Sequence, residues 1–368
     1  MTAPRALATL AAAGLVALAL SLGLRGVAGT QAQDPDWGFN QDWVADPTQV
    51  SKTGQGPNGI GATTNRLIVR WRDVERDPPR GSVHSYDWSA PRAAYDAMLS
   101  AGETPVLTLE AAPDWARAPG WQSCPEYTEG CEYPPAPTHD GDWREFVHQA
   151  ITQFPQALAI EVWNEPNFNR FWYSAPNTIP DVARYADVLH AARLGASDAG
   201  TSVPVITGGL SPGLGSPNKM AQADFLTALY QRGSAADFTG IGEHVYPRGA
   251  ASQQQWVTAQ AATINELRSV RDGYNNQSSQ IWVTEVGVST ASNAGSAVSE
   301  TDQGPTLAAL YRNVGSDVKV FLIHQYQDTN SPNANTTDIF GHMGVVHQDL
   351  TPKPALGYLG CDLGGRDC

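Results

Sequence analysis

The stretch AIEVWNEPNF, residues 159–168, is an apolar run typical of a buried β-strand, and it ends on an amide and a carboxylate. Similar short β-rich runs recur along the chain, with enough residues between them for a helix. They cover residues 65–71, 104–110, 157–163, 203–209, 238–246, 280–287 and 318–326, with a weaker run at 37–43. The pattern therefore predicts a series of strands in which the quoted stretch is the fourth.

Helical patterns separate these runs. They cover residues 89–102, 143–154, 179–200, 220–233, 255–273, 301–315 and 352–360, and several of them end on glycine. Strands that alternate with helices pair in parallel through right-handed crossovers. Eight such units favour an α/β fold in the form of a single closed (β/α)8 TIM barrel. The alternative is an open doubly wound sheet, but the glycine-rich phosphate fingerprint of a dinucleotide fold is absent after the first strands.

The N-terminal segment has the layout of a secretory signal. Arg5 precedes an apolar run that extends to Leu22, and small residues follow it. We therefore expect residues 1–32 to be a signal peptide and residues 33–368 to form one secreted, extracellular domain without an appended module. The alternative is that this segment stays attached as an N-terminal membrane anchor. No later stretch of the chain is apolar enough to span a bilayer.

The composition narrows the choice of partners. The chain has 368 residues, 41% of them hydrophobic, and a formal net charge of −14. This apolar content is sufficient for a substantial core. An acidic chain without basic runs is a poor ligand for nucleic acid or for an anionic membrane surface. We therefore expect no nucleic-acid partner and, after signal cleavage, no membrane partner.

The four cysteines fit an oxidising compartment. Proximity in the sequence favours two local disulfides, Cys124 with Cys131 and Cys361 with Cys368. Zinc binding is the alternative, but neither pair has the spacing of a zinc site and no histidine pair completes one. We expect no metal and no other cofactor.

Polar residues gather at the predicted carboxyl ends of the strands. Catalytic groups of a (β/α)8 barrel lie at these ends and in the loops that follow them. The residues in these positions are Arg66, Arg70, Glu110, Asn164, Glu165, His244, Tyr246, Glu285, His324, Gln325 and Tyr326. One rim of the barrel is therefore expected to carry the functional site.

Two of these residues, Glu165 and Glu285, could form a catalytic pair. If the fourth and seventh strands face each other across the barrel, both carboxyl groups look into one cleft. Glycoside hydrolysis needs one carboxyl group that protonates the leaving oxygen and one carboxylate that attacks the anomeric carbon. The alternative, from the residues alone, is that each glutamate is a solvated rim residue.

Strand parity makes the end of the fourth strand unusual. In a regular strand Glu161, Trp163 and Glu165 share one face, and Asn164 points to the other. Asn164 and Glu165 can enter one cleft only if the regular geometry breaks, and Pro166 marks such a break. We expect Glu161 to belong to an inner polar layer of the barrel.

Six ordered segments resemble the clan A retaining glycoside hydrolases of the cellulase and family 39 type. VWNEPN (162–167) and WVTEVG (282–287) look like the family's two signatures, and RLIVRWRDVER (66–76), APDWA (112–116), EHVYP (243–247) and TPKPALGYL (351–359) match in order. The resemblance implies a catalytic domain with Glu165 as general acid/base and Glu285 as nucleophile. Retention implies carboxyl groups about 5–5.5 Å apart.

The resemblance also implies roles for their neighbours. Asn164 would bind the sugar 2-hydroxyl, Arg66 and Tyr246 would support the nucleophile, and His244 would contact the sugar or its binding residues. Many clan members end the eighth strand on a Trp that forms the floor of the sugar site. This chain has FLIHQYQD (321–328) there, so His324, Gln325 or Tyr326 would replace that Trp.

Loop aromatics complete the expected carbohydrate site, because sugar C–H faces stack on aromatic rings. Trp115, Trp121, Phe171, Trp172 and Tyr173 lie in the loops after the third and fourth strands. We expect the loop of residues 116–140 to determine specificity. The chain would be a monomeric, secreted hydrolase of plant or cell-wall polysaccharide or oligosaccharide. A transglycosylase with the same residues and a non-catalytic carbohydrate-binding barrel remain alternatives.

Overall fold

The computed structural model describes residues 34–118, 132–173, 179–212, 218–246 and 252–367. Residues 1–32, Trp121, and the cysteines at 124, 131 and 368 lie outside these ranges. The expected signal peptide and the expected cysteine pairings therefore stay predictions, although Cys361 is disulfide-bonded. Within the described residues, no helix is long and apolar enough to cross a membrane.

Eight parallel strands close into a barrel, and each strand pairs with its neighbours in chain order. They are β1 (Asp36–Asn40), β2 (Thr64–Arg70), β3 (Val106–Glu110), β4 (Ala159–Asn164), β5 (Val205–Gly209), β6 (Gly240–Val245), β7 (Gln280–Val286) and β8 (Val318–His324). β1 closes the ring, because it pairs with both β2 and β8. The expected (β/α)8 architecture is confirmed, including the weak first strand.

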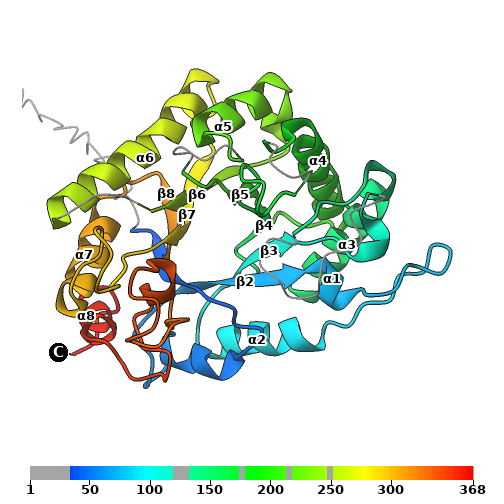
Figure 1. Ribbon diagram of the computed structural model, residues 1–368. Helices are drawn as coiled ribbons and strands as arrows, with labels where there is room; N and C mark the ends of the chain where they lie inside the picture. The colour runs from blue at the N-terminus through cyan, green and yellow to red at the C-terminus, as the bar shows by residue number, and fades with distance from the viewer. Residues whose placement is uncertain (1–33, 119–131, 174–178, 213–217, 247–251, 368) are drawn as a thin grey trace, which may run out of the picture. The chain divides into compact units, whose positions relative to one another are not determined.

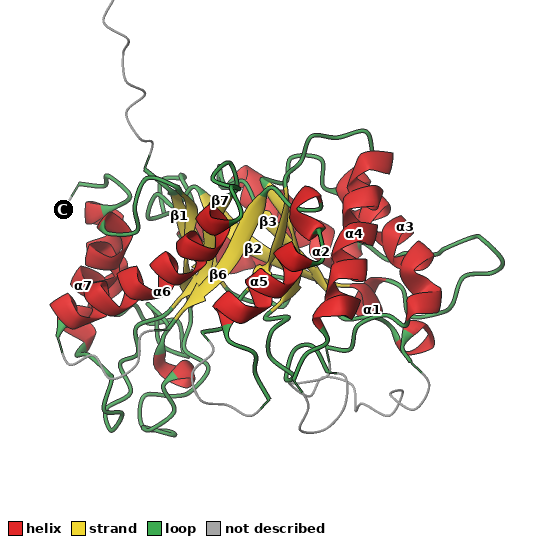
Figure 2. Cartoon of the chain, turned by 90° about the horizontal axis from the view of Figure 1, so that it is seen from above, coloured by secondary structure: helices red, strands yellow, loops and turns green. Residues whose placement is uncertain are grey.

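The helices surround this barrel (Figures 1 and 2). They are α1 (Trp71–Val74), α2 (Ser89–Ser100), α3 (Asp140–Gln153), α4 (Val182–Asp198), α5 (Gln222–Gln231), α6 (Gln253–Gly273), α7 (Glu300–Arg312) and α8 (Pro354–Asp362). Several begin at a side-chain cap of the expected type. Asp181 accepts from the backbone of Ala183, Ser252 from Gln255, and Ser299 from Asp302.

The barrel interior changes from apolar to polar along the strands. One group of buried side chains fills its amino-terminal half: Val106, Ala159, Ile206, Trp282, Val320 and Leu322. Further along the strands Arg66, Thr108 and Glu161 point inward and bond one another. This confirms the expected inner polar layer. The large apolar core lies outside the barrel, between strands and helices. Inside the barrel, the polar layer lies directly beneath the side chains at the carboxyl ends of the strands.

Candidate active site

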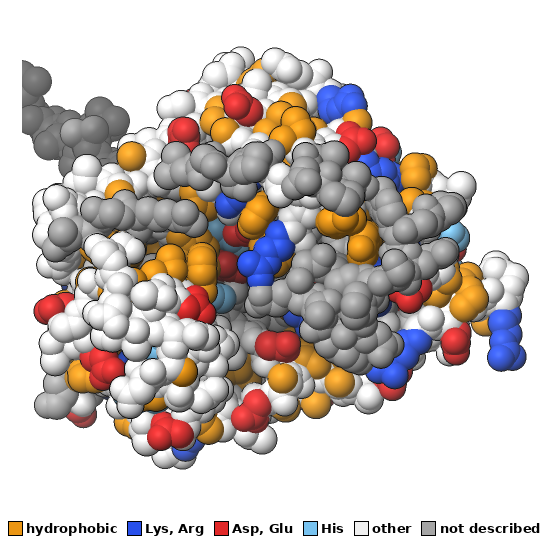
Figure 3. All heavy atoms as spheres, in the orientation of Figure 1, with side chains coloured by type: hydrophobic (Ala, Val, Ile, Leu, Met, Phe, Trp, Pro, Cys, Tyr) orange, Lys and Arg blue, Asp and Glu red, His pale blue; other side chains and the backbone are white. Residues whose placement is uncertain are grey.

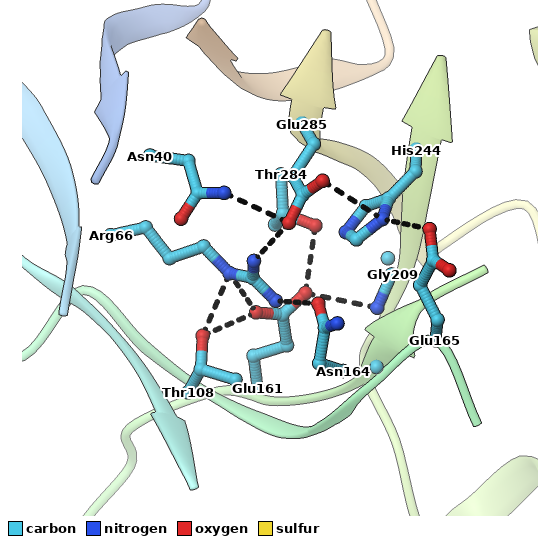
Figure 4. Close-up of polar contacts among 12 residues, drawn as sticks. Asn40, Arg66, Thr108, Glu161, Asn164, Glu165, Gly209, His244, Thr284 and Glu285 are labelled. Carbon is cyan, nitrogen blue, oxygen red and sulfur yellow. Dashed lines mark hydrogen bonds and ion pairs between the residues drawn. The ribbon is translucent and has the colours of Figure 1, made fainter. Parts of the chain in front are cut away.

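The carboxyl ends of the strands bring the predicted pair of glutamates together. Glu165 follows β4, Glu285 lies near the end of β7, and His244 lies between them on β6 (Figure 4). Acidic and histidine side chains lie in a hollow on this face of the molecule (Figure 3). Glu165 is 7% exposed and Glu285 8%, so both carboxyl groups reach the hollow from largely buried positions.

The end of β4 breaks regular geometry in a way that turns both polar side chains inward. Trp163 has φ 78° and Glu165 has φ 41°, a left-handed conformation that costs a non-glycine residue about 1–3 kcal/mol. As a result the Trp163 ring leaves the barrel face of Glu161 and packs outside against Trp143 and Trp172. The predicted break is real, but it begins at Trp163, three residues before the proline expected to mark it.

β7 is also irregular near its carboxyl end, across the barrel from the break in β4. Its pairing with β8 shifts between Val283 and Val286. Two consecutive side chains therefore face the interior: the Thr284 hydroxyl donates to Glu161 at 2.7 Å, and Glu285 accepts from Arg66. Irregular strand ends on both sides of the barrel thus place the glutamates in one hollow, and irregularities of this kind are frequent next to active sites.

Glu285 is surrounded by hydrogen-bond donors. Its Oε1 accepts from Arg66 Nη1 at 2.6 Å and from Asn40 Nδ2 at 2.8 Å. Its Oε2 accepts from the Tyr246 hydroxyl. Burial by itself would raise the pKa of Glu285, but the positive charges of His244, His324 and Arg66 together with the Tyr246 hydrogen bond lower it to about 2. Glu285 is therefore a carboxylate at neutral pH.

Arg66 is held by a second carboxylate. It is fully buried, and its Nε donates to Glu161 at 2.6 Å while its Nη2 donates to Asn164 Oδ1 at 2.9 Å. Glu161 also accepts from the Gly209 amide at 2.9 Å and from two threonine hydroxyls. A guanidinium fixed on two sides is a rigid donor, so Arg66 orients both Glu285 and Asn164.

His244 connects the two glutamates. Its Nδ1 lies 2.9 Å from Glu165 Oε1 and 3.3 Å from Glu285 Oε2. One oxygen from each carboxyl group and one ring nitrogen all lie within 4.8 Å of one another. Inverting glycosidases hold their carboxyl groups about 6.5–9.5 Å apart to admit a water, and retaining ones about 5–5.5 Å. The short separation here agrees with the second class.

The same three residues have the donor types of a metal site, but their surroundings do not suit a cation. Both oxygens of Glu285 already accept from donors of the protein, and one of these donors is the permanently charged Arg66. A bound metal ion would have to face this guanidinium at short range and displace its hydrogen bond. The arrangement instead suits an ionised carboxylate beside a second carboxyl group.

Three predicted sugar contacts have rings that pack against other aromatic side chains, and two of these rings, those of Trp172 and Tyr326, are almost completely buried. Trp172 is fully buried between Trp163 and Tyr185. Tyr326 is 3% exposed. It packs on two aromatic rings of the amino-terminal segment, Phe39 and Trp43. Trp115 is partly buried, and it packs edge-on against Trp71 at 5.3 Å and against His139.

The end of β8 contributes through two other residues. His324 Nδ1 lies 3.0 Å from Asn40 Nδ2, beside the nucleophile candidate, and burial lowers the pKa of His324. Gln325 is 6% exposed, and its side chain reaches the carbonyl of Phe340 at 3.5 Å. Of the three residues expected to replace the Trp of other clan members, His324 thus contacts Asn40, a donor to Glu285. Gln325 contacts the nearby loop at Phe340.

Two residues at the site, Asn40 and Phe340, were not predicted from the sequence. Asn40 ends the weak first strand, and its register opposite Arg66 and His324 places it beside Glu285. The only available signal was its position as the last residue of that strand. Phe340 packs edge-on against Tyr246 with ring centroids 5.4 Å apart. It lies in the loop between β8 and α8, where no strand pattern locates it.

Comparison with known proteins finds no matching family model and no matching curated protein. Solved structures do match. A family 39 glycoside hydrolase from Bacteroides cellulosilyticus is 17% identical with a TM-score of 0.60, and the match covers 90% of this chain and 64% of that one. A monomeric β-xylosidase from Caulobacter crescentus is also 17% identical, with a TM-score of 0.61 and coverage of 90% and 69%.

A third match is a GH5_18 protein from Streptomyces cattleya, solved in complex with GlcNAc. It is 16% identical with a TM-score of 0.61, and the match covers 90% of this chain and 80% of that one. At these identities the likeness concerns the fold. The chain has the (β/α)8 barrel fold found in these family 39 and family 5 glycoside hydrolases, as its sequence motifs led us to expect. It spans just under two thirds of the first of them.

Proposed function

We propose that this protein is a retaining glycoside hydrolase, with Glu285 as nucleophile and Glu165 as general acid/base. One observation carries the proposal: two carboxyl groups with oxygens within 4.8 Å differ in their surroundings. Glu285 accepts three hydrogen bonds from Arg66, Asn40 and Tyr246, which keep it ionised. Within the described part of the chain, the Glu165 side chain is hydrogen-bonded to His244 alone, which leaves its second oxygen for proton exchange with a substrate.

The reaction takes two steps. An oxygen of Glu285 attacks the anomeric carbon while the bond to the leaving oxygen breaks, and Glu165 gives its proton to that oxygen. A glycosyl ester on Glu285 results. In the second step the Glu165 carboxylate removes a proton from water, the water oxygen attacks the anomeric carbon, and Glu285 is released. Asn164, fixed by Arg66 at 2.9 Å, would bind the 2-hydroxyl throughout.

The substrate would be a plant or cell-wall polysaccharide or oligosaccharide. The β-xylosidase among the structural neighbours and the signal-like segment of residues 1–32 support a secreted enzyme of this kind. We propose that the protein is a monomer, and the monomeric state of that β-xylosidase supports this assignment. The substrate class and the oligomeric state rest on likeness in fold and on a pattern at the N-terminus, whereas the reaction rests on the geometry of the site.

A glycan-panel hydrolysis screen tests the proposal. The wild type should cleave at least one glycan, and Glu285→Ala should lose that activity by a factor of at least about 10⁴, because nucleophile and acid act as one unit. Activity that survives in Glu285→Ala without an added nucleophile would refute the assignment. Transfer of the sugar to a second sugar, seen by product analysis, would indicate a transglycosylase. Binding without cleavage would indicate a carbohydrate-binding barrel.

Glu165→Ala separates the two roles. Its loss should be smaller on aryl glycosides with good leaving groups than on natural glycans, because such leaving groups need little protonation. Initial rates on both substrate types measure this difference. Equal losses on the two would count against Glu165 as the acid.

A further inference from the structure

One large apolar side chain beside the site is exposed to solvent. Phe340 is 43% exposed, and its ring meets the ring of Tyr246 at 5.4 Å and 72°. The Tyr246 hydroxyl in turn donates to Glu285. A single tyrosine ring therefore separates the exposed phenyl group from the candidate nucleophile. Leaving so much apolar area in water forgoes about 25 cal/mol per Å², so a ligand that covered it would gain affinity.

The loop around Phe340 is internally hydrogen-bonded, and these bonds hold the backbone that carries the ring. The Phe340 amide donates to Asp338 Oδ1 at 3.1 Å, and Asn330 Nδ2 donates to Asp338 Oδ2 at 2.9 Å. The Asn330 amide also donates to the Gly341 carbonyl at 3.1 Å. A Cβ at Gly341 would lie 1.9 Å from the Asn330 side chain. A larger residue at 341 would therefore displace the Asn330 side chain and disturb its hydrogen bond to Asp338.

Topology decides which part of a substrate Phe340 would meet. Glu165 follows β4, whereas Phe340 follows β8, and these two strands are opposite in an eight-membered ring. The proposed acid must lie beside the leaving oxygen, so the leaving group extends toward the β4 side. The sugar that Glu285 attacks, together with any sugar beyond it, extends toward β8. The Phe340 ring also packs on Tyr246, the residue that donates to Glu285, so we assign Phe340 to the glycone side.

We propose that Phe340 is the stacking platform for a neutral pyranose ring on the glycone side of the cleft. The loop between β8 and α8 would supply the aromatic face that Tyr326 and Trp172 cannot, because those two rings are packed in the core. A phenyl ring offers a flat apolar face to the axial C–H groups of a sugar. This inference rests on the proposed hydrolase function and adds the residue that selects the glycone.

The test compares Phe340→Ala with Phe340→Trp and with a matched control. Tyr274→Ala suits the control, since Tyr274 is 40% exposed and lies between α6 and β7, at the opposite end of that strand from Glu285. Phe340→Ala should raise KM and the inhibition constant of the released glycone about tenfold, a typical effect of losing one aromatic contact. Phe340→Trp should restore both, and Tyr274→Ala should change neither.

Two further readouts separate a platform from a merely structural role. The Phe340→Ala effect should be the same for aryl glycosides with different leaving groups, and kcat and the acid limb of the pH profile should not move. Unchanged constants would overturn the proposal. So would an effect that depends on the leaving group, or a fall in kcat with a shifted acid limb, which would mean that Phe340 acts by positioning Tyr246.

Failure of the hydrolase proposal is recognised separately. If the wild type cleaves no glycoside, calorimetric titration with mono- and oligosaccharides still compares wild type with Phe340→Ala. Weaker binding by the variant would support the platform without hydrolysis. Equal binding, or no binding by either protein, would overturn the platform as well.

Discussion

Removing the Tyr246 hydroxyl should raise the pKa of the nucleophile. Glu285 has a pKa of about 2 and accepts hydrogen bonds from Tyr246, Arg66 and Asn40. Tyr246→Phe deletes one of these donors and leaves the other two, both on the opposite carboxylate oxygen. A hydrogen bond to a charged group contributes about 1.5–3 kcal/mol, and one pKa unit corresponds to about 1.36 kcal/mol. The pKa of Glu285 should therefore rise by about one to two units.

The assay is the pH dependence of kcat/KM on an aryl glycoside, from initial rates after a pH jump. Glu285 must be ionised to attack, so its pKa sets the acid limb of the profile. This limb should move from about pH 2 in the wild type to about pH 3–4 in Tyr246→Phe. Tyr326→Phe is the control: its ring packs on Phe39 and Trp43, and its acid limb should stay in place. An unmoved or lowered limb in Tyr246→Phe would refute the reasoning.

The same contacts predict how stability depends on pH. The pKa of Glu285 falls on folding from 4.5 to about 2, so its contribution is fully present above pH 4.5 and is lost as the pH falls to about 2. Tyr246→Phe, with a smaller depression of this pKa, should be less stable than wild type above pH 4.5. The difference should shrink between pH 4.5 and 2. Urea midpoints across this range measure it, and a pH-independent difference would contradict the account.

Two other substitutions test the supports of the site and of the fold. Gly209→Ala should lower kcat/KM at least tenfold while the chain still folds. An added Cβ would lie 2.2 Å from His244 Nε2, and overpacking of this kind forces a side chain to move. Full activity in the variant would contradict this close fit. Lys353→Met should lower the free energy of unfolding by about 3–5 kcal/mol, since it removes the cation 2.8 Å from buried Asp328 and leaves this carboxylate with the Gly344 amide and, at 3.7 Å, the His347 ring. An unchanged urea midpoint would show that this pair does not stabilise the fold.

The fold could be predicted because local signals agreed with the global architecture. The strand and helix periods alternate, and helix starts such as Ser299 carry the capping side chains that their positions require. The residues at strand ends followed from the same reasoning, since the carboxyl ends of parallel strands share one rim. Glu165, Glu285, His244 and Tyr246 are together for that reason.

The detailed positions of the site side chains could not be predicted, because they depend on departures from regular strand geometry. The positions of the loop aromatic rings depend on which of them pack into the core. Strand parity and Pro166 predicted a break at the end of the fourth strand, but nothing in the sequence places its positive φ at Trp163, and this position decides which side chains enter the barrel. An aromatic ring in a loop is equally compatible with core and cleft. Trp172 is packed in the core and Phe340 is exposed beside Tyr246, and only the path of each loop distinguishes them.

The central claim is that Glu285 forms a covalent bond to the sugar. It is tested most directly with a glycoside of a cleaved sugar that has a fast leaving group and a 2-fluoro substituent, which slows the second step. We expect a stable adduct of one sugar mass on the protein, which peptide mass mapping locates on Glu285. The sugar released from an unmodified substrate should keep its anomeric configuration. An adduct on another carboxylate, or turnover without an adduct and with inverted configuration, would contradict the claim.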